Sequence, residues 1–254
     1  MCKRSGSVVA LGVLVALVLA GAARPGGFPH FGAGCSRDDF TSGGTTIRAE
    51  LCRAGLGPRR AVVVLHGCGG LSTFDHRLVA ELPRFGISTL DVDYFAPTPP
   101  PGVKGFCNAR SRARDAFPSW VEVARDAGRA LRGGGVAPPT GVGVVGWSLG
   151  GAVAIEAAAA PTGQRIFAAV AAFSTGGRGA TPAFAALLPP TILLSAGTTD
   201  AIPLAETLPL FRALRAAHVA SSLYVYPHGS HDWPGRQGTL GIRHAAAFLR
   251  AHLG

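Results

Sequence analysis

The stretch GVVGWSLGGAV, residues 143–153, changes character within a few residues. An apolar run ends at Trp147, and an alanine-rich run with helical spacing begins just after Ser148. Gly146, Ser148 and Gly150 form a G-x-S-x-G pattern, which is typical of a serine exposed on a sharp strand-to-helix turn. The chain has 36 glycines in 254 residues, so the pattern also arises by chance, and the rest of the sequence must decide its meaning.

Short β-branched or apolar runs alternate with helix-spaced segments along the chain. The runs predict strands over residues 61–66, 87–93, 142–147, 166–173, 191–197 and 222–227. The segments between and after them predict helices over residues 75–85, 114–131, 149–160, 203–218 and 240–253. This alternation predicts an α/β fold with a mostly parallel sheet that is covered by helices on both faces.

The segment before the first of these strands has a different composition. It is rich in Gly, Arg, Ser and Thr, with short strand-like pieces such as TTIRAELC at residues 45–52. We expect it to form an antiparallel edge at the start of the sheet. No internal repeat or linker separates two cores, so residues 24–254 are expected to form a single domain.

Residues 1–23, MCKRSGSVVALGVLVALVLAGAA, have the layout of a secretory signal peptide. Lys3 and Arg4 precede an uncharged apolar run over residues 8–20, and small residues at 20–22 offer a cleavage site. A membrane anchor is the alternative, but the run is shorter than the roughly 20 residues that span a bilayer. We therefore expect a secreted or periplasmic protein that has no membrane association after cleavage.

Four cysteines follow this segment: Cys35, Cys52, Cys68 and Cys107. An exported chain meets an oxidising compartment, so the even count predicts two disulfides. Four cysteines allow three pairings, and the sequence alone does not choose among them; we favour Cys35–Cys52 and Cys68–Cys107. No C-x-x-C pair is present, which argues against redox or zinc chemistry, and no metal site is expected.

The formal net charge is +10 at pH 7, and nearly all of the positive charge is scattered arginine. A nucleic-acid-binding protein concentrates such charge in a patch or along one helix. We therefore expect no nucleic-acid partner. A weak general attraction to anionic surfaces remains compatible with this charge.

A serine needs a base and an orienting carboxylate before it acts as a nucleophile. The acids that follow Ser148 in the chain are Glu156, Asp200, Glu206 and Asp232. Glu156 and Glu206 fall inside predicted helices, and Asp232 adjoins the best candidate histidine. Asp200, in SAGTTDAIP, directly follows a predicted strand, which is where the acid of a Ser, Asp, His order belongs.

The candidate bases after Asp200 are His218, His228, His231, His244 and His252. Three of them lie on or at the end of predicted helices and are expected to be surface or packing residues. His228 and His231 follow the last predicted strand, in YPHGSHDW, and we favour His231 because it lies deeper in the loop. A loop histidine with only a structural hydrogen bond is the alternative, but Ser148 and Asp200 at matching strand ends favour a base.

The early segment VVVLHGCGG, residues 62–70, ends a predicted strand in a glycine-rich turn. Such a turn presents backbone N–H groups to an oxyanion, and so does the N-terminus of the helix after Ser148. We assign the donors as the N–H groups of Cys68 and Leu149. His66 is expected to brace the turn without taking part in the reaction, and an ordinary tight turn is the alternative.

Together these segments resemble the α/β-hydrolase superfamily and, within it, the dienelactone hydrolase-like branch. LHGCGGL, GWSLGG, GTTDAIP and YPHGSHDW carry the resemblance, which spans most of residues 45–254. It implies an α/β-hydrolase fold with a mostly parallel eight-stranded sheet flanked by helices. It also implies no cofactor, and hydrolysis of carboxylic esters through an acyl-enzyme.

Two positions depart from that branch. Dienelactone hydrolases use a cysteine nucleophile where this chain has Ser148, and a glutamate where it has Gly67. The resemblance therefore implies a serine ester hydrolase with the triad Ser148, His231 and Asp200, and not an enzyme for dienelactone itself. A peptidase or thioesterase on the same triad, and a non-catalytic binding protein on the same fold, are the alternatives.

The connection over residues 174–190, where related hydrolases often insert a lid, is short and rich in Gly, Ala and Pro. We therefore expect no large lid and an open cleft. Tyr94, Trp147 and Trp233 are candidates for lining the cleft, although each fits the core equally well. The expected partner is a small-molecule or polymeric ester, and the sequence carries no signal of oligomeric state.

Overall fold

The computed structural model describes residues 34–55, 59–102, 104–177, 180–198 and 200–254. The predicted signal peptide over residues 1–23 lies outside the described residues. Among the residues described, no helix has the combination of length and apolar character that a membrane crossing requires.

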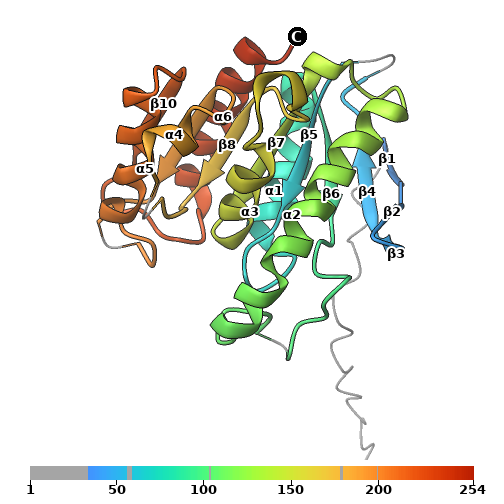
Figure 1. The fold of residues 1–254 in the computed structure, drawn as a ribbon, viewed down its shortest axis with the longest axis horizontal. Helices are drawn as coiled ribbons and strands as arrows, with labels where there is room; N and C mark the ends of the chain where they lie inside the picture. Colours follow the sequence, from blue (N-terminus) through green and yellow to red (C-terminus); the bar gives the residue numbers. More distant parts are fainter. Residues whose placement is uncertain (1–33, 56–58, 103, 178–179, 199) are drawn as a thin grey trace, which may run out of the picture.

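A twisted eight-stranded sheet forms the centre of the molecule, in the order β1-β4-β6-β5-β7-β8-β9-β10 (Figure 1). The strands are β1 Cys35–Arg37, β4 Ala49–Cys52, β5 Arg60–Leu65, β6 Ile87–Val92, β7 Val142–Trp147, β8 Val170–Phe173, β9 Thr191–Ser195 and β10 Ser221–Val225. β4 pairs antiparallel with both β1 and β6, and the other neighbours are parallel. The predicted sheet and its antiparallel first edge are therefore confirmed. A separate hairpin joins β2 Phe40–Ser42 to β3 Thr45–Ile47.

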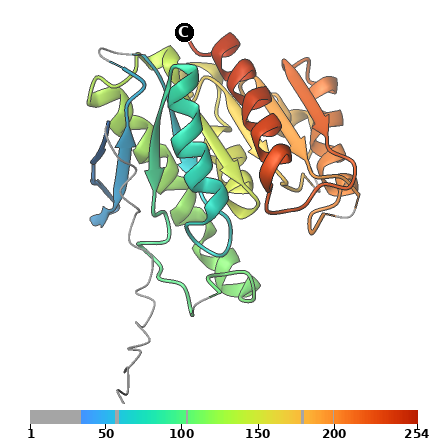
Figure 2. The same cartoon turned by 180° about the vertical axis from the view of Figure 1, so that it is seen from behind.

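Helices cover both faces of the sheet (Figures 1 and 2). One face carries α1 Thr73–Glu81 and α6 Gly235–His252, and the other carries α2 Arg110–Gly133, α3 Leu149–Ala158, α4 Pro182–Ala185 and α5 Leu204–Ala216. Single 3₁₀ turns span Leu82–Phe85, Pro139–Gly141 and Thr162–Gln164. The first turns of α2 and the loop before them project beyond the carboxyl ends of the parallel strands (Figure 1).

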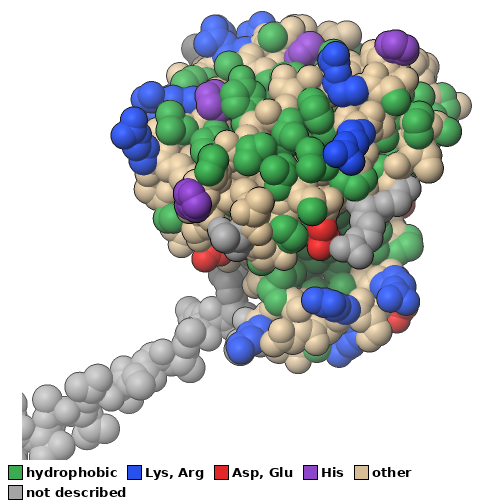
Figure 3. Space-filling view, turned by 90° about the vertical axis from the view of Figure 1, so that its left-hand side faces the viewer, with side chains coloured by type: hydrophobic (Ala, Val, Ile, Leu, Met, Phe, Trp, Pro, Cys, Tyr) green, Lys and Arg blue, Asp and Glu red, His purple; other side chains and the backbone are tan. Residues whose placement is uncertain are grey.

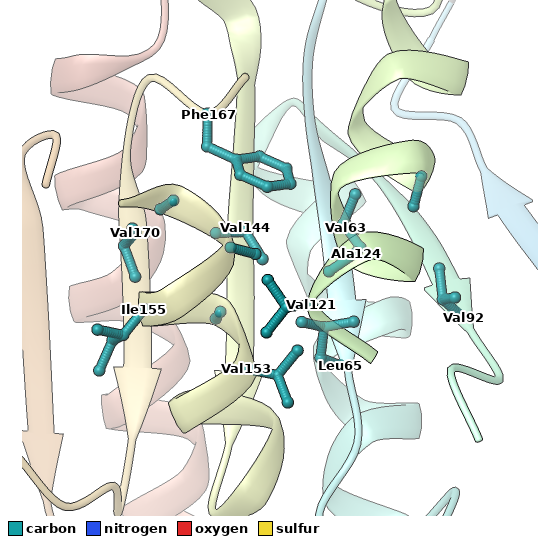
Figure 4. Close-up of a cluster of buried hydrophobic side chains, with 14 of the residues drawn as sticks. Val63, Leu65, Val92, Val121, Ala124, Val144, Val153, Ile155, Phe167 and Val170 are labelled. Carbon is teal, nitrogen blue, oxygen red and sulfur yellow. The ribbon is translucent and has the colours of Figure 1, made fainter. Parts of the chain in front are cut away.

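The core consists of two apolar layers, one on each face of the sheet. Because side chains alternate along a strand, Val63 and Leu65 of β5 face α2 and α3, whereas Val62 and Val64 face α1 and α6. Figure 4 shows Val63 and Leu65 pointing towards Val121. Burying a side chain of this size contributes about 1.5–3 kcal/mol. Both layers together hold β5 and β7 rigidly at the centre of the sheet.

Two disulfides tie peripheral segments to this sheet. Cys35–Cys52 joins β1 to β4, and Cys68–Cys107 joins the turn after β5 to the loop before α2. These are the two pairs favoured from the sequence.

Candidate active site

Ser148 lies at the sharp turn between β7 and α3. Its backbone has φ 56° and ψ −118°, and its N–H donates to the Phe173 carbonyl oxygen at 2.9 Å. A non-glycine residue at positive φ costs about 1–3 kcal/mol and persists only where its surroundings enforce it. A Cβ on Gly146 would lie 2.1 Å from the Gly150 carbonyl oxygen, and one on Gly150 would lie 2.2 Å from the Leu65 carbonyl oxygen. Both flanking glycines are therefore required for this turn.

His231 connects Ser148 to Asp200. Its Nε2 lies 3.0 Å from the Ser148 Oγ, and its Nδ1 lies 2.5 Å from the Asp200 Oδ1. With the ring proton on Nδ1, the imidazole donates to the carboxylate and accepts the hydroxyl proton of Ser148. The structure thus brings together the three side chains that the sequence places at separate strand ends, after β7, β9 and β10.

The Asp200 carboxylate is buried and held by three donors. Besides His231, the Ser174 hydroxyl donates to Oδ2 at 2.5 Å, and the Ile202 N–H donates to Oδ1 at 3.1 Å. Burial acts to raise the pKa of Asp200, but the hydrogen bonds from His231, Ser174 and Ile202 outweigh it, so the pKa is lower than usual. Asp200 is therefore charged at neutral pH and able to stabilise a protonated His231.

Ser174 is a member of the site that the sequence patterns did not single out. It follows β8 directly, has φ 42°, and is fully buried. Its Oγ donates to Asp200 and accepts a hydrogen bond from the Trp233 Nε1 at 3.0 Å. The sequence feature that could have identified Ser174 is its position at the end of a predicted strand, on the same sheet edge as Ser148 and Asp200.

The aromatic residues expected to line the cleft have other positions. Trp233 and Tyr94 have no exposed surface, so the prediction that they line a cleft is wrong. The polar atom of each ring donates a hydrogen bond inside the protein. The Trp233 Nε1 donates to Ser174, and the Tyr94 hydroxyl donates to the His66 carbonyl oxygen at 2.8 Å. Trp147 is 8% exposed and donates from Nε1 to the His231 carbonyl oxygen at 2.8 Å, so it supports the histidine loop.

The turn after β5 lies directly against the serine turn. The Leu65 and His66 carbonyl oxygens contact Gly150 so closely that no side chain fits there. Burial lowers the pKa of His66 to about 4, and its Nδ1 lies 2.9 Å from the Gly67 carbonyl oxygen, which suits a neutral bracing residue. Leu149 opens α3, so its N–H has no partner within the helix. The Cys68 and Leu149 N–H groups thus belong to two adjacent turns.

A groove begins one helical turn beyond Ser148. Its volume is about 350 Å³, and its walls come from α2, α3, α4, α5 and the loop after β8. It is lined by Phe117, Ala152, Ile155, Glu156, Gly176, Gly177, Ala180, Phe184 and Leu210. Figure 3 shows the molecule hollowed between its body and its projecting part, with hydrophobic side chains inside. In the described part of the connection from β8 to β9, α4 is the one helix, with four residues, and no large lid is present over the site among the residues that the structure describes. Within the described part of the chain, no cluster of three or more His, Cys, Asp or Glu side chains is arranged to hold a metal ion.

Solved structures share this fold. A dienelactone hydrolase-like promiscuous phosphotriesterase from metagenomic libraries is 18% identical, with a TM-score of 0.70 over 87% of this chain and 98% of that one. A dienelactone hydrolase from Anabaena variabilis is 18% identical, with a TM-score of 0.65 over 87% and 98% of the two chains. A cold-adapted esterase from an Arctic intertidal metagenomic library is 16% identical, with a TM-score of 0.64 over 87% and 94%.

The sequence itself matches a family at the segment that carries the candidate site. No curated protein sequence matches the chain. The model of the dienelactone hydrolase family matches residues 111–250, a range that contains Ser148, Asp200 and His231 and more than half of the chain. The protein therefore belongs to the dienelactone hydrolase family.

Proposed function

We propose that this hydrolase is an exported serine esterase that cleaves carboxylic esters through an acyl-enzyme. The observation that carries the proposal is the hydrogen-bonded chain from the Ser148 Oγ through His231 to the buried Asp200. The Oγ attacks the ester carbonyl carbon while the His231 Nε2 takes its proton, and the Asp200 carboxylate stabilises the resulting imidazolium. The N–H groups of Cys68 and Leu149 donate to the tetrahedral oxyanion.

Collapse of this intermediate completes the first half of the reaction. His231 returns the proton to the leaving alcohol, and the acyl group stays on Ser148. A water molecule, deprotonated by His231, then attacks the acyl-enzyme by the same route and releases the acid. No step in this sequence needs a cofactor.

Export follows from the N-terminal segment and from the cysteines. Residues 1–23 act as a signal peptide in this proposal, and residues 24–254 form the mature single domain. The two disulfides fit an oxidising compartment outside the cytoplasm.

The groove beside Ser148 accommodates the acyl part of the ester. His231 reaches Ser148 from the side of α6, where its loop packs on Trp147. The leaving alcohol must receive its proton from His231, so it lies on that side, and the acyl chain extends towards α2, α3 and α5. Among the described residues that line the groove, Glu156 alone is charged, and its negative charge disfavours anionic acyl chains there.

A panel of substrates tests this function. We expect p-nitrophenyl esters to be hydrolysed faster than matched thioesters and peptide anilides, with kcat/KM rising along the acyl series from acetate. Ala152→Phe, which fills the near end of the groove, should lower kcat/KM for octanoate relative to acetate on the order of 10-fold, since each buried CH₂ is worth about 0.8 kcal/mol. Ala216→Phe, on the exposed end of α5, is the control.

The results of the panel test the esterase assignment and the acyl site separately. Faster cleavage of thioesters or anilides than of esters would contradict the esterase assignment. An unchanged chain-length preference in Ala152→Phe would exclude the groove as the acyl site while leaving the reaction itself intact.

A further inference from the structure

We propose that the Cys68–Cys107 disulfide holds the oxyanion donor in place, so that ester hydrolysis depends on this bond and Cys107 acts as a positioning residue. The inference rests on the proposed function, in which the Cys68 N–H donates to the oxyanion. It also links activity to the compartment in which the disulfide forms.

Cys68 has little support from its own turn. It is half-buried and lies in the sequence Gly67-Cys68-Gly69-Gly70, which permits many backbone conformations. A Cβ added to Gly69 or to Gly70 would meet no atom within 4 Å, so the space that a side chain would fill at these two positions is empty. The turn is closed by one backbone hydrogen bond, from the Gly70 N–H to the Gly67 carbonyl oxygen at 3.1 Å. His66 and Trp147 brace Gly67, the residue before Cys68, whereas Gly69 and Gly70 after it have no such side-chain support.

The loop that carries Cys107 is firmly anchored, in contrast. Phe106 is 2% exposed, and its ring lies 4.7 Å from the ring of Phe95 and 4.7 Å from that of Trp120 on α2. Both contacts are edge-to-face, the geometry that aromatic pairs prefer. Cys107 follows Phe106 directly, so its backbone is held in place by the packing of Phe106 in the core.

Two contacts connect Cys68 to this anchored loop. The Phe106 N–H donates to the Cys68 carbonyl oxygen at 2.7 Å, and the disulfide brings the two Cα atoms to 4.9 Å. A Cβ on Gly105 would lie 2.2 Å from the same carbonyl oxygen, so only glycine permits this approach. The disulfide is thus the covalent part of a clamp between the aromatic cluster and the backbone of Cys68, where the hydrogen bond holds the carbonyl group and the disulfide holds the Cα.

The donor N–H belongs to the preceding Gly67–Cys68 peptide group, which is joined to the clamped carbonyl group through the Cys68 Cα. The orientation of this peptide group sets the strength of the donor. Loss of one oxyanion donor typically costs 10²–10³-fold in kcat, and a freed glycine-rich turn points its N–H away from the oxyanion for much of the time. We expect the cost of breaking the disulfide to be about 10-fold or more in kcat, because the hydrogen bond from Phe106 remains.

Reduction provides a reversible form of the same change. Two thiols of dithiothreitol transfer two electrons and two protons to the disulfide, which becomes the thiols of Cys68 and Cys107, and the reagent closes to its cyclic disulfide. Oxidised glutathione reverses the step by thiol–disulfide exchange. The newly made chain is therefore expected to have low activity in a reducing compartment and to gain activity after export.

The second disulfide supplies a matched control. Cys35–Cys52 joins the edge strand β1 to β4, and β6 and β5 separate these strands from β7 and Ser148. We compare the full chain carrying Cys68→Ser with Cys107→Ser against the full chain carrying Cys35→Ser with Cys52→Ser. The measurements are kcat, KM, thermal midpoint and inhibition by a trifluoromethyl ketone analogue of the best ester, which forms the tetrahedral adduct.

The expected result is a change in kcat without a change in KM. In the Cys68/Cys107 variant, kcat falls about 10-fold or more and affinity for the ketone falls by a similar factor, while KM stays within about 2-fold. The Cys35/Cys52 variant keeps its kcat even where its thermal midpoint drops. Should the first variant not fold, the native enzyme is reduced stepwise, and activity is compared with the free thiols at each cysteine, located by mass spectrometry.

Several outcomes overturn the inference. An unchanged kcat in the Cys68/Cys107 variant, an equal loss in both variants, or full activity after reduction at Cys68 would each do so. Failure of the proposed function looks different, since the oxidised native enzyme would then hydrolyse no ester at all.

Discussion

Replacing His231 by alanine is expected to lower kcat for the best ester on the order of 10⁴- to 10⁶-fold, as the loss of a triad base does in serine hydrolases. The reason is geometric, because the His231 Nε2 is 3.0 Å from the Ser148 Oγ and provides the base that the hydroxyl needs. The measurement is kcat for a p-nitrophenyl ester, with the thermal midpoint recorded for each variant.

His228 is the matched control, since it lies three residues earlier in the same loop. Its side chain is exposed, and its backbone has φ 62°. We expect His228→Ala to keep kcat within about 2-fold, as is usual for a surface substitution away from the site. A loss of activity in His228→Ala together with full activity in His231→Ala would reverse the assignment of the base.

Asp200→Asn is expected to lower kcat by about 10⁴-fold, because an amide in place of the carboxylate favours the wrong tautomer of the histidine. In the wild type, the His231 Nδ1–H donates to a carboxylate whose pKa is lowered, despite burial, by His231, Ser174 and Ile202. The side-chain amide of the variant would instead present an N–H to the ring. KM should change little, since the carboxylate touches no substrate.

The Asp232→Asn variant tests whether a carboxylate that is merely adjacent to His231 in the sequence supports the base. Asp232 is exposed and lies next to the histidine, and its carboxylate forms no ion pair among the described residues. We expect this variant to keep its activity within about 2-fold. Equal losses in the Asp200 and Asp232 variants would mean that general electrostatics, and not the hydrogen bond to Nδ1, support the base.

The sheet and its rim could be predicted because they depend on local patterns. Buried parallel strands are mostly apolar, so β5, β7 and β9 are recognisable as apolar, β-branched runs, and β6 is recognisable from Ile87, Leu90 and Val92 although polar residues lie between them. The catalytic residues are expected in the order Ser, Asp, His, and each is expected directly after a strand, because parallel strands end at one edge of the sheet. These two conditions leave few candidate residues for the acid and the base. The positions of Ser148, Asp200 and His231 follow from these two constraints.

What the sequence did not reveal depends on packing across the chain. Trp233 and Tyr94 are large aromatic residues of the kind that often line clefts. In the structure, each makes a hydrogen bond inside the core and is fully buried. α6 begins at Gly235, earlier than the predicted residue 240, and Gly238 in the added segment is a packing position, because a Cβ there would collide with the Trp233 carbonyl oxygen. Intrinsic propensity disfavours glycine in helices, so the sequence pattern alone did not include these residues.

Covalent labelling of Ser148 tests the central claim most directly. The native enzyme is treated with a fluorophosphonate, and the modified residue is located by mass spectrometry of its peptides. We expect a single adduct on Ser148 and a parallel loss of ester hydrolysis, with no adduct in the folded Ser148→Ala variant. Equal labelling of that variant, or undiminished hydrolysis by it, would contradict the claim that Ser148 is the nucleophile.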